Sequence, residues 1–146
     1  NCIAVDINPA PLKFLRSNGV LTVQANLFAL PFPAGSVKQV ILSNLIQHIS
    51  KDAFNLDEVK RVLAADGKLL IASPDYSNPR WKFLDKLHSW ILPRAPGSQI
   101  KSRYSKAELV ELLTKSGFKI ENSLDILGSE IAISSRLISR LSSSLS

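Results

Sequence analysis

The sequence predicts an α/β fold with a mainly parallel sheet and helices on both of its faces. Short apolar runs typical of buried strands alternate with segments in which apolar residues recur at helical spacing. This alternation is typical of strand–helix–strand units, in which each helix carries the chain back to begin the next parallel strand. The 146 residues fit one domain, and their apolar fraction of 45% is that of an ordinary globular protein.

The first third of the chain supplies three predicted strands and one helix. Asn8 is a good N-cap residue, Pro9 suits the first helical position, and Gly19 follows the last apolar residue of the helical pattern. A loop with two prolines, at residues 26–36, precedes the third strand. The three strands are predicted at residues 2–6, 21–25 and 37–43.

The rest of the chain continues the alternation. Residues 55–63 carry apolar side chains at helical spacing, and Asp66-Gly67 is expected to terminate this helix. Ser105 and Glu108 have the spacing of a capping box, which predicts a helix that stops at Gly117. The other predicted elements are strands at 68–73, 118–127 and 130–134, a helix at 80–92, and a tail at 135–146 that either forms a surface helix or frays.

The net charge is concentrated in one window. From Arg80 to Lys106 there are seven basic residues and a single acid, Asp85, so this window accounts for the whole formal charge of +6. Both tryptophans, Trp81 and Trp90, also lie in it. Such a window attracts anions such as phosphates, lipid head groups or nucleic acid, or it is only the solvated face of a helix.

Several classes of protein are excluded by composition. The longest uncharged apolar runs, such as residues 40–46, are far shorter than the roughly 18–20 residues that cross a bilayer. A single cysteine and two histidines predict no disulfide framework, no metal site and no Ser-His-Asp triad. We therefore expect a soluble, cytoplasmic protein. Because the chain has no Met and opens directly on an apolar run, we also expect it to be a fragment.

Polar residues follow the predicted strands at the edge where parallel sheets bind ligands. Asp6, Asn26, Ser43 and Asn44 each come at or just after the end of such a strand. A carboxylate in the position of Asp6 can accept hydrogen bonds from the vicinal hydroxyls of a ribose, although an Asp at a strand end also serves simply to cap the next helix.

The order of these motifs resembles the class I S-adenosylmethionine-dependent methyltransferases, in the subgroup that methylates small molecules and includes the ubiquinone and menaquinone methyltransferases. The Leu-Pro-Phe-Pro loop at 30–33 and the Asp-Gly-Lys-Leu-Leu-Ile turn at 66–71 are specific as a pair. The stretches that carry the resemblance are 5–8, 26–36, 43–49, 58–71 and 104–118.

The resemblance implies a Rossmann-like domain over residues 1–134 that transfers a methyl group from S-adenosylmethionine to a small-molecule acceptor. Asp6 would bind the ribose hydroxyls, and Asn26 would accept from the adenine amino group where the family usually has an Asp. His48, just after the third strand, is the candidate catalytic residue, or it caps a short helix. The implied cofactor-binding residues are Asp6, Ile7, Asn26, Leu27, Phe28, Ser43 and Asn44.

The resemblance also implies that one element is missing. Family members carry a strand and a Gly-rich turn before the position of Cys2, and this chain contains no Gly-x-Gly. That strand is central in the family's sheet, where the strand ending at Asp6 and the strand ending at Ser43 both pair with it. We therefore expect a gapped or rearranged sheet, poor folding and weak cofactor binding.

Residues 76–104 lie between a strand and the capping-box helix, and we predict that they form a basic lid over the acceptor pocket. Its helix would point Trp81, Leu84, Leu87, His88 and Ile91 inward, toward an acceptor that is anionic or lipid-like, or it would only pack on the sheet.

Two other functions stay open at this stage. One is a catalytically inactive module on the same fold, which binds an anionic ligand, a lipid or nucleic acid through residues 80–106. The other is a fragment of a nicotinamide-dependent dehydrogenase that uses Asp6 as its ribose acid. Nucleic acid is not favoured as a partner, and membrane contact is expected to be peripheral at most.

Overall fold

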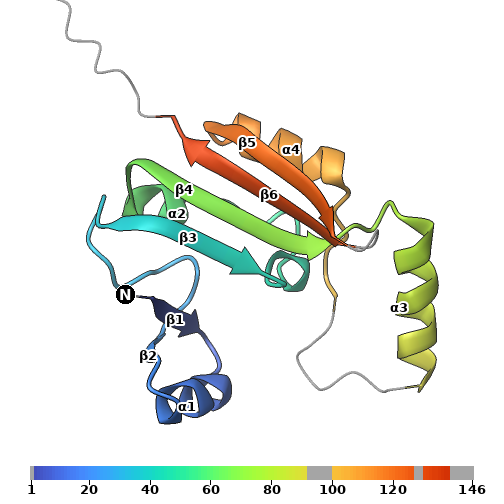
Figure 1. Cartoon of the computed structure of the whole chain (residues 1–146), viewed down its shortest axis with the longest axis horizontal. Coiled ribbons are helices and arrows are strands. Elements are labelled where there is room, and N and C mark those ends of the chain that lie inside the picture. The colour runs from blue at the N-terminus through green and yellow to red at the C-terminus, as the bar shows by residue number, and fades with distance from the viewer. Residues whose placement is uncertain (1, 92–99, 127–129, 139–146) are drawn as a thin grey trace, which may run out of the picture.

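The strands form two separate sheets in the computed structural model, which describes residues 2–91, 100–126 and 130–138 (Figure 1). The strands are β1 (Ile3–Asp6), β2 (Leu21–Gln24), β3 (Val37–Ser43), β4 (Leu63–Pro74), β5 (Phe118–Ile126) and β6 (Glu130–Leu137). The first sheet has the order β1-β2 and the second has the order β3-β4-β6-β5. The α/β class that the sequence predicted is confirmed.

Local signals explain the first unit. Helix α1 (Pro9–Ser17) connects β1 to β2, which run parallel. It begins where predicted, because the side chain of Asn8 accepts from the backbone N–H of Ala10 at 2.9 Å. It ends before Gly19, whose φ of 80° lies in the left-handed region that glycine adopts without strain.

The second sheet is mixed. Strand β3 pairs in parallel with β4, whereas β6 is antiparallel to both β4 and β5. Strands β5 and β6 are consecutive in the chain, and consecutive strands commonly pair in the antiparallel direction. Four helices complete the fold: η1 (Ile46–His48), α2 (Asp57–Val62), α3 (Pro79–Ile91) and α4 (Lys106–Lys115).

The boundary between α2 and β4 differs from the prediction. The helix ends at Val62, and the strand begins at Leu63 instead of continuing as helix to Asp66-Gly67. Leu63 is buried in the core, so the chain turns straight from helix into strand. Residues 64–67 form a bulge in β4, and a Cβ on Gly67 would lie 2.8 Å from the carbonyl oxygen of Ala64. Glycine is therefore required for this close approach, not for a helix end.

The ends of the last helix and strand show one agreement and one difference. The capping box of α4 is present, with Ser105 accepting from the N–H of Glu108 and the Glu108 side chain accepting from the N–H of Ser105. Strand β6 continues to Leu137, beyond the predicted end at residue 134, because the buried Ser135 donates from its Oγ to the Leu69 carbonyl at 3.1 Å. Leu137 therefore belongs to a strand and not to a tail helix. The rest of the predicted tail helix, residues 139–146, lies outside the described residues.

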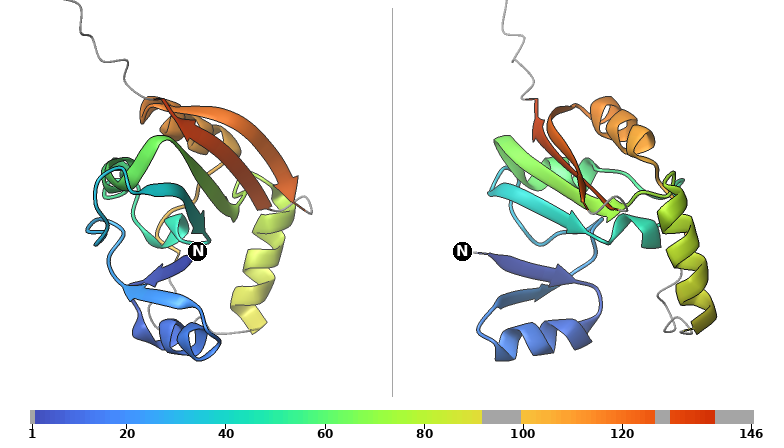
Figure 2. Two further views of the ribbon diagram at one scale, coloured as in Figure 1. Left: turned by 60° about the vertical axis from the view of Figure 1, so that its left-hand side comes forward. Right: turned by 45° about the vertical axis from the view of Figure 1, so that its right-hand side comes forward.

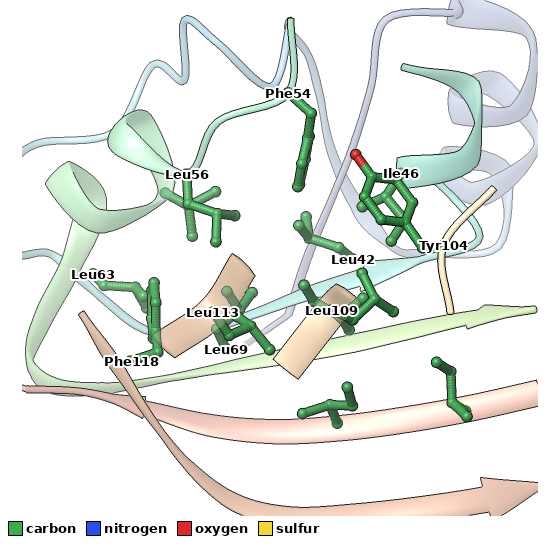
Figure 3. Close-up of a cluster of buried hydrophobic side chains, with 14 residues drawn as sticks. Leu42, Ile46, Phe54, Leu56, Leu63, Leu69, Tyr104, Leu109, Leu113 and Phe118 are labelled. Carbon is green, nitrogen blue, oxygen red and sulfur yellow. The ribbon is translucent and has the colours of Figure 1, made fainter. Parts of the chain in front are cut away.

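The hydrophobic core lies on one face of the second sheet (Figure 3). Leu69 and Ile71 of β4 point to this face, where α2 and α4 cover them with Val59, Leu109 and Leu113. The opposite face carries Ile41 and Leu70, which are paired in register, and Ile41 is exposed. The other members of the core cluster are Leu42, Ile46, Phe54, Leu56, Leu63, Tyr104, Phe118, Ile131 and Ile133.

The two sheets are not joined by hydrogen bonds. No described strand pairs with β3 on the side opposite to β4, and β1 has only β2 as a partner among the described strands (Figures 1 and 2). The expected gap between the strand ending at Asp6 and the strand ending at Ser43 is confirmed. No helix of the described residues is long and apolar enough to cross a membrane.

Candidate functional site

Asp6 lies exposed at the carboxyl end of β1. Its Oδ1 accepts from the backbone N–H of Asn8 at 2.7 Å, so the side chain closes the turn into α1. The carbonyl of Asp6 accepts from the N–H of Ala25 at 3.1 Å, which holds the ends of β1 and β2 together. The carboxylate therefore has a fixed orientation and one oxygen directed to a local turn, while the side chain as a whole faces solvent beside the exposed Ile7.

The chain after β2 forms a tight turn that displays an aromatic ring. The side-chain oxygen of Asn26 accepts from the N–H of Phe28 at 3.1 Å. The backbone carbonyl of Asn26 accepts from the N–H of Ala29 at 3.0 Å. Phe28 is exposed, whereas Leu27 is half-buried against the core of the second sheet. Asn26 therefore acts first as the organiser of this turn, with one lone pair of its amide oxygen already in use.

A charged clamp that the sequence did not predict holds the next part of the loop. Glu58 and Arg61, three residues apart on α2, are joined by two hydrogen bonds of 2.7 Å. Arg61 also donates to the carbonyls of Leu30 (2.9 Å) and Phe32 (3.0 Å), and Glu58 accepts from the N–H of Leu30 at 2.8 Å. Because the guanidinium can donate in several directions at once, one arginine fixes both sides of the proline-rich loop.

Its partners favour the ionised form of Glu58. Hydrogen bonding to Arg61, together with the N–H of Leu30, lowers the pKa of Glu58 from 4.5 to about 2. The Glu58 side chain is 19% exposed, so its partners replace much of its hydration. The i, i+3 spacing of an acid and an arginine was visible in the sequence, but the carbonyls that Arg61 binds belong to a distant loop and were not.

The end of β3 forms a second group of predicted residues. Ser43 is exposed in the last position of the strand, and Asn44 adopts a φ of 49° in the left-handed region. The N–H of Asn44 donates to the carbonyl of Ala72 at 2.9 Å, which holds the end of β3 against β4. The short helix η1 follows, with Gln47 buried and His48 half-buried. Asparagine tolerates this backbone conformation better than other non-glycine residues, which explains its place at this turn.

Gln47 connects this turn to the chain that returns from the insert. Its carbonyl accepts from the N–H groups of Lys101 (2.8 Å) and Ser102 (3.1 Å). The Oε1 of its side chain is buried and has no hydrogen-bond partner in the part of the chain that the structure describes. A buried amide oxygen in this state costs free energy, which is typical of sites that bind a further polar group.

A second charged cluster fixes the start of α4. The ammonium of Lys51 pairs with Glu108 and lies 4.9 Å from the centre of the buried Tyr104 ring. This pairing, together with the backbone N–H of Ser105, lowers the pKa of Glu108 to about 2. Burial raises the pKa of the Tyr104 hydroxyl. Tyr104 also accepts from the N–H of Tyr76 at 3.1 Å through its carbonyl, so the two stems of the insert are tied together.

An open cavity of about 780 Å³ lies beside these stems. Its lining includes three acids and one lysine, and that lysine, Lys106, lies 3.4 Å from Asp125. The lining residues are Asp75, Ser77, Asn78, Ser105, Lys106, Ala107, Val110, Asp125 and Glu130. The negative lining does not favour an anion, and none of the residues singled out from the sequence as cofactor-binding or catalytic takes part in it.

The structure therefore brings the predicted residues together in two groups. Asp6, Ile7, Asn26, Leu27 and Phe28 gather at the ends of β1 and β2, and the others gather at the end of β3. Both groups lie at carboxyl ends of parallel strands, as the sequence predicted, but no described strand links the two sheets. Among the described residues there is no group of three or more His, Cys, Asp or Glu side chains that could hold a metal.

Comparison with known proteins gives one family. Residues 1–71 match a family described as a methyltransferase domain. The chain is 32% identical over 129 residues to a probable S-adenosylmethionine-dependent methyltransferase of Mycolicibacterium smegmatis, covering 85% of this chain and 46% of that protein. It is 35% identical over 104 residues to the ubiquinone/menaquinone biosynthesis C-methyltransferase of Citrobacter koseri, covering 64% of this chain and 41% of that protein. The chain thus spans less than half the length of these relatives.

Solved structures show the same fold. A methyltransferase of Thermotoga maritima, described as a possible histamine N-methyltransferase, superposes with a TM-score of 0.74 at 18% identity, covering 92% of this chain and 72% of that one. An S-adenosylmethionine-dependent methyltransferase of Archaeoglobus fulgidus gives 0.72 at 16% identity, covering 92% and 75%. At these identities the likeness concerns the fold alone.

Proposed function

We propose that this chain, which belongs to the S-adenosylmethionine-dependent methyltransferases, binds S-adenosylmethionine at the carboxyl ends of β1, β2 and β3 for methyl transfer to a small-molecule acceptor. The observation that carries the proposal is the exposed carboxylate of Asp6 at the end of a parallel strand, followed in the chain by the exposed Ile7, with the exposed Phe28 in the turn after the neighbouring strand β2. A carboxylate beside apolar surface fits a nucleoside, whose ribose presents two hydroxyl donors next to a flat aromatic base.

The first group of residues would hold the adenosine. Asp6 uses Oδ1 for the turn into α1, which leaves Oδ2 and the second lone pair of Oδ1 for the ribose hydroxyls. Phe28 and Ile7 offer apolar surface to the base. The remaining lone pair of the Asn26 amide oxygen is suited to the adenine amino group, and Leu27 anchors the same turn in the core. The clamp of Glu58 and Arg61 holds the residues that follow this turn, through hydrogen bonds to the backbone of Leu30 and Phe32.

The second group would hold the methionine part and the acceptor. S-adenosylmethionine supplies, when bound, a methyl group on a positively charged sulphur. Ser43 and Asn44 offer polar groups at the end of β3, and Gln47 and His48 follow at the next turn. Methyl transfer depends mainly on the alignment of the acceptor with the methyl group, so positioning by these side chains matters more than proton transfer. His48, the candidate catalytic residue, would be one of the side chains that position the acceptor there.

The insert of residues 76–104 would cover the acceptor side of this site. Its two stems are tied to each other by the bond from the N–H of Tyr76 to the carbonyl of Tyr104, and the returning stem is tied to η1 through the carbonyl of Gln47. A segment held at both of its stems suits a lid that excludes water and selects the acceptor. Leu84, His88 and Ile91, which the sequence predicted to point inward with Trp81 and Leu87, have side chains outside the described part of the chain.

The test is a titration of the chain with S-adenosylhomocysteine and, separately, with NAD. Because no described strand lies between β1 and β3, we expect S-adenosylhomocysteine to bind weakly but measurably, and NAD not to bind. Asp6→Asn keeps an oxygen acceptor for the turn but removes the charge, and it should weaken S-adenosylhomocysteine binding by roughly tenfold to a hundredfold. Asp75→Asn is the matched control, because Asp75 also follows a strand and accepts from a backbone N–H two residues on, that of Ser77, at 2.9 Å.

Equal affinity in the two variants would remove Asp6 from the site. Binding of NAD in preference to S-adenosylhomocysteine would contradict the proposal as a whole and favour a dehydrogenase. Circular dichroism of both variants should match that of the unaltered chain, because both side chains lie at strand ends where the turn survives the substitution.

A further inference from the structure

Helix α3 carries an apolar stripe on its solvent-exposed side. Phe83, Leu87 and Trp90 are 67%, 39% and 84% exposed, and their spacing of i, i+4 and i+7 places them on one face of the helix. Exposing one large apolar side chain is common, but a continuous stripe of three is typical of a surface that binds something. Leu87, which the sequence predicted to point inward, lies on this exposed side of the helix instead.

The helix projects from the body of the protein (Figures 1 and 2). It is attached at its first turn, where the rings of Trp81 and Tyr76 meet edge to face at 5.9 Å, and where the side chain of Asn78 accepts from the N–H of Arg80 at 2.9 Å. Beyond this turn the ribbon extends away from the second sheet (Figure 2). A partner can therefore approach the stripe along most of its length.

The charges around the stripe are almost all positive. Arg80, Lys82 and Lys86 are exposed on the same helix, and Lys101 and Arg103 are exposed on the chain that returns to the second sheet. Asp85 is the one acid in the window from residue 80 to residue 106. This pattern argues against a second copy of the chain as the occupant, because two such helices would repel each other.

We propose that α3 docks this protein on the surface of a bilayer that contains anionic lipids. The stripe would enter the boundary between head groups and acyl chains, where tryptophan rings are favoured, while the basic side chains stay at the level of the negative head groups. Nucleic acid fits less well, because its backbone attracts the basic residues but offers nothing to a stripe of Phe, Leu and Trp. The proposal does not depend on the proposed methyl transfer.

The test is co-sedimentation of the chain with vesicles of phosphatidylcholine alone and of phosphatidylcholine mixed with phosphatidylglycerol. We expect binding only to the mixed vesicles, weakened by salt. The double substitution Phe83→Ser with Trp90→Ser should reduce this binding by about tenfold or more, because both rings leave water on docking. Phe14→Ser is the matched control, since Phe14 is equally exposed on α1, and it should leave binding unchanged.

Two further measurements separate the contributions. Arg80→Gln with Lys82→Gln should weaken binding to mixed vesicles by about thirtyfold, at roughly 1 kcal/mol for each of the two charges near the surface. In a Trp81→Phe background, the emission of Trp90 should shift to the blue when mixed vesicles are added. Because the side chains of Phe14, Arg80, Lys82, Phe83 and Trp90 are exposed, the thermal transition of each variant at these positions should match that of its parent chain.

Several results would overturn the proposal. They are absence of binding to mixed vesicles, binding that survives the loss of Phe83 and Trp90, or an emission of Trp90 that does not move. Binding of duplex DNA that requires Arg80 and Lys82, without binding of vesicles, would assign the surface to nucleic acid instead. Self-association that disappears in the double Ser variant, again without vesicle binding, would assign the stripe to a second copy of the chain.

Discussion

The four-stranded sheet is more buried than the unit formed by β1, α1 and β2, although the strands of both contain apolar runs. The strands β1 and β4 both contain runs of aliphatic residues. Ile3 of β1 is nevertheless 43% exposed, whereas Leu69 of β4 is fully buried. Strand β4 has a partner strand on each side and two helices on one face, while β1 has one partner strand and one helix among the described residues.

The difference shows that an apolar run becomes a buried strand only through its neighbours. A strand has two edges and two faces, and each must be covered by other elements before the strand leaves water. In the four-stranded sheet these neighbours are present and a continuous core results. In the first unit Leu12 is the only side chain that is buried among the described residues, so burial of apolar surface stabilises this unit little.

The largest expected effect comes from removing equivalent side chains in the two regions. Phe118→Ala should lower the free energy of unfolding by about 3–5 kcal/mol, because Phe118 is 1% exposed and its loss leaves a cavity. Phe14→Ala should change it by less than about 0.5 kcal/mol, because Phe14 is 70% exposed. Urea denaturation followed by circular dichroism measures both. Equal effects of the two substitutions would contradict the comparison.

Native-state hydrogen exchange should resolve the same contrast along the chain. We expect the amides of β1 and β2 to exchange at least about a hundredfold faster than those of β4 and β6, because a two-stranded unit opens at little cost. Adding S-adenosylhomocysteine should slow exchange in β1 and β2 if the proposed site is correct. Uniform protection across the two sheets would show that they unfold as one unit.

The clamp on the connection between the two regions should have a smaller and more local effect. Arg61→Met removes the donors to the carbonyls of Leu30 and Phe32, so exchange of the Leu30 amide should become roughly tenfold faster. Lys60→Met is the matched control, because Lys60 pairs only with the exposed Asp57 on the same helix. If both variants behave like the parent chain, the clamp does not hold the loop.

The pH dependence of this contact should be the smallest effect. Hydrogen bonding to Arg61 lowers the pKa of Glu58 to about 2, so its stabilising contribution is complete above pH 4.5 and is lost as the pH falls toward 2. The amide resonance of Leu30, which donates to Glu58, should titrate in that window and not near 4.5. In Glu58→Gln the resonance should no longer titrate there. A midpoint at the ordinary pKa of glutamate would show that the clamp is open in solution.

Local signals in the sequence account for most of the secondary structure. Asn8 with Pro9 begins α1, and Ser105 with Glu108 begins α4, because capping depends on residues that are close in the chain. The β3 boundaries agree with the prediction at both ends. The α2 and β4 boundary was missed, because the end of the helix is decided by burial of Leu63 and not by the Asp66-Gly67 turn.

The candidate site was predictable in part. The order of strands placed Asp6, Asn26 and Asn44 at the same edge of parallel pairs, because each strand of such a pair ends on the same side. Their local bonds, in which Asp6 and Asn26 each close a turn, also follow from sequence neighbours. The clamp of Arg61 and the buried Gln47 oxygen were not predictable, because their surroundings come from distant segments.

The sequence by itself therefore determined the helices, the strands and the edge at which the candidate residues lie, since periodicity and capping act over a few residues. Only the tertiary structure decided that the outer face of α3 exposes Phe83 and Trp90, and that Arg61 meets a loop about thirty residues away. The physical reason is that burial and ion pairing depend on which surfaces meet after the chain has folded, and local sequence does not contain that information.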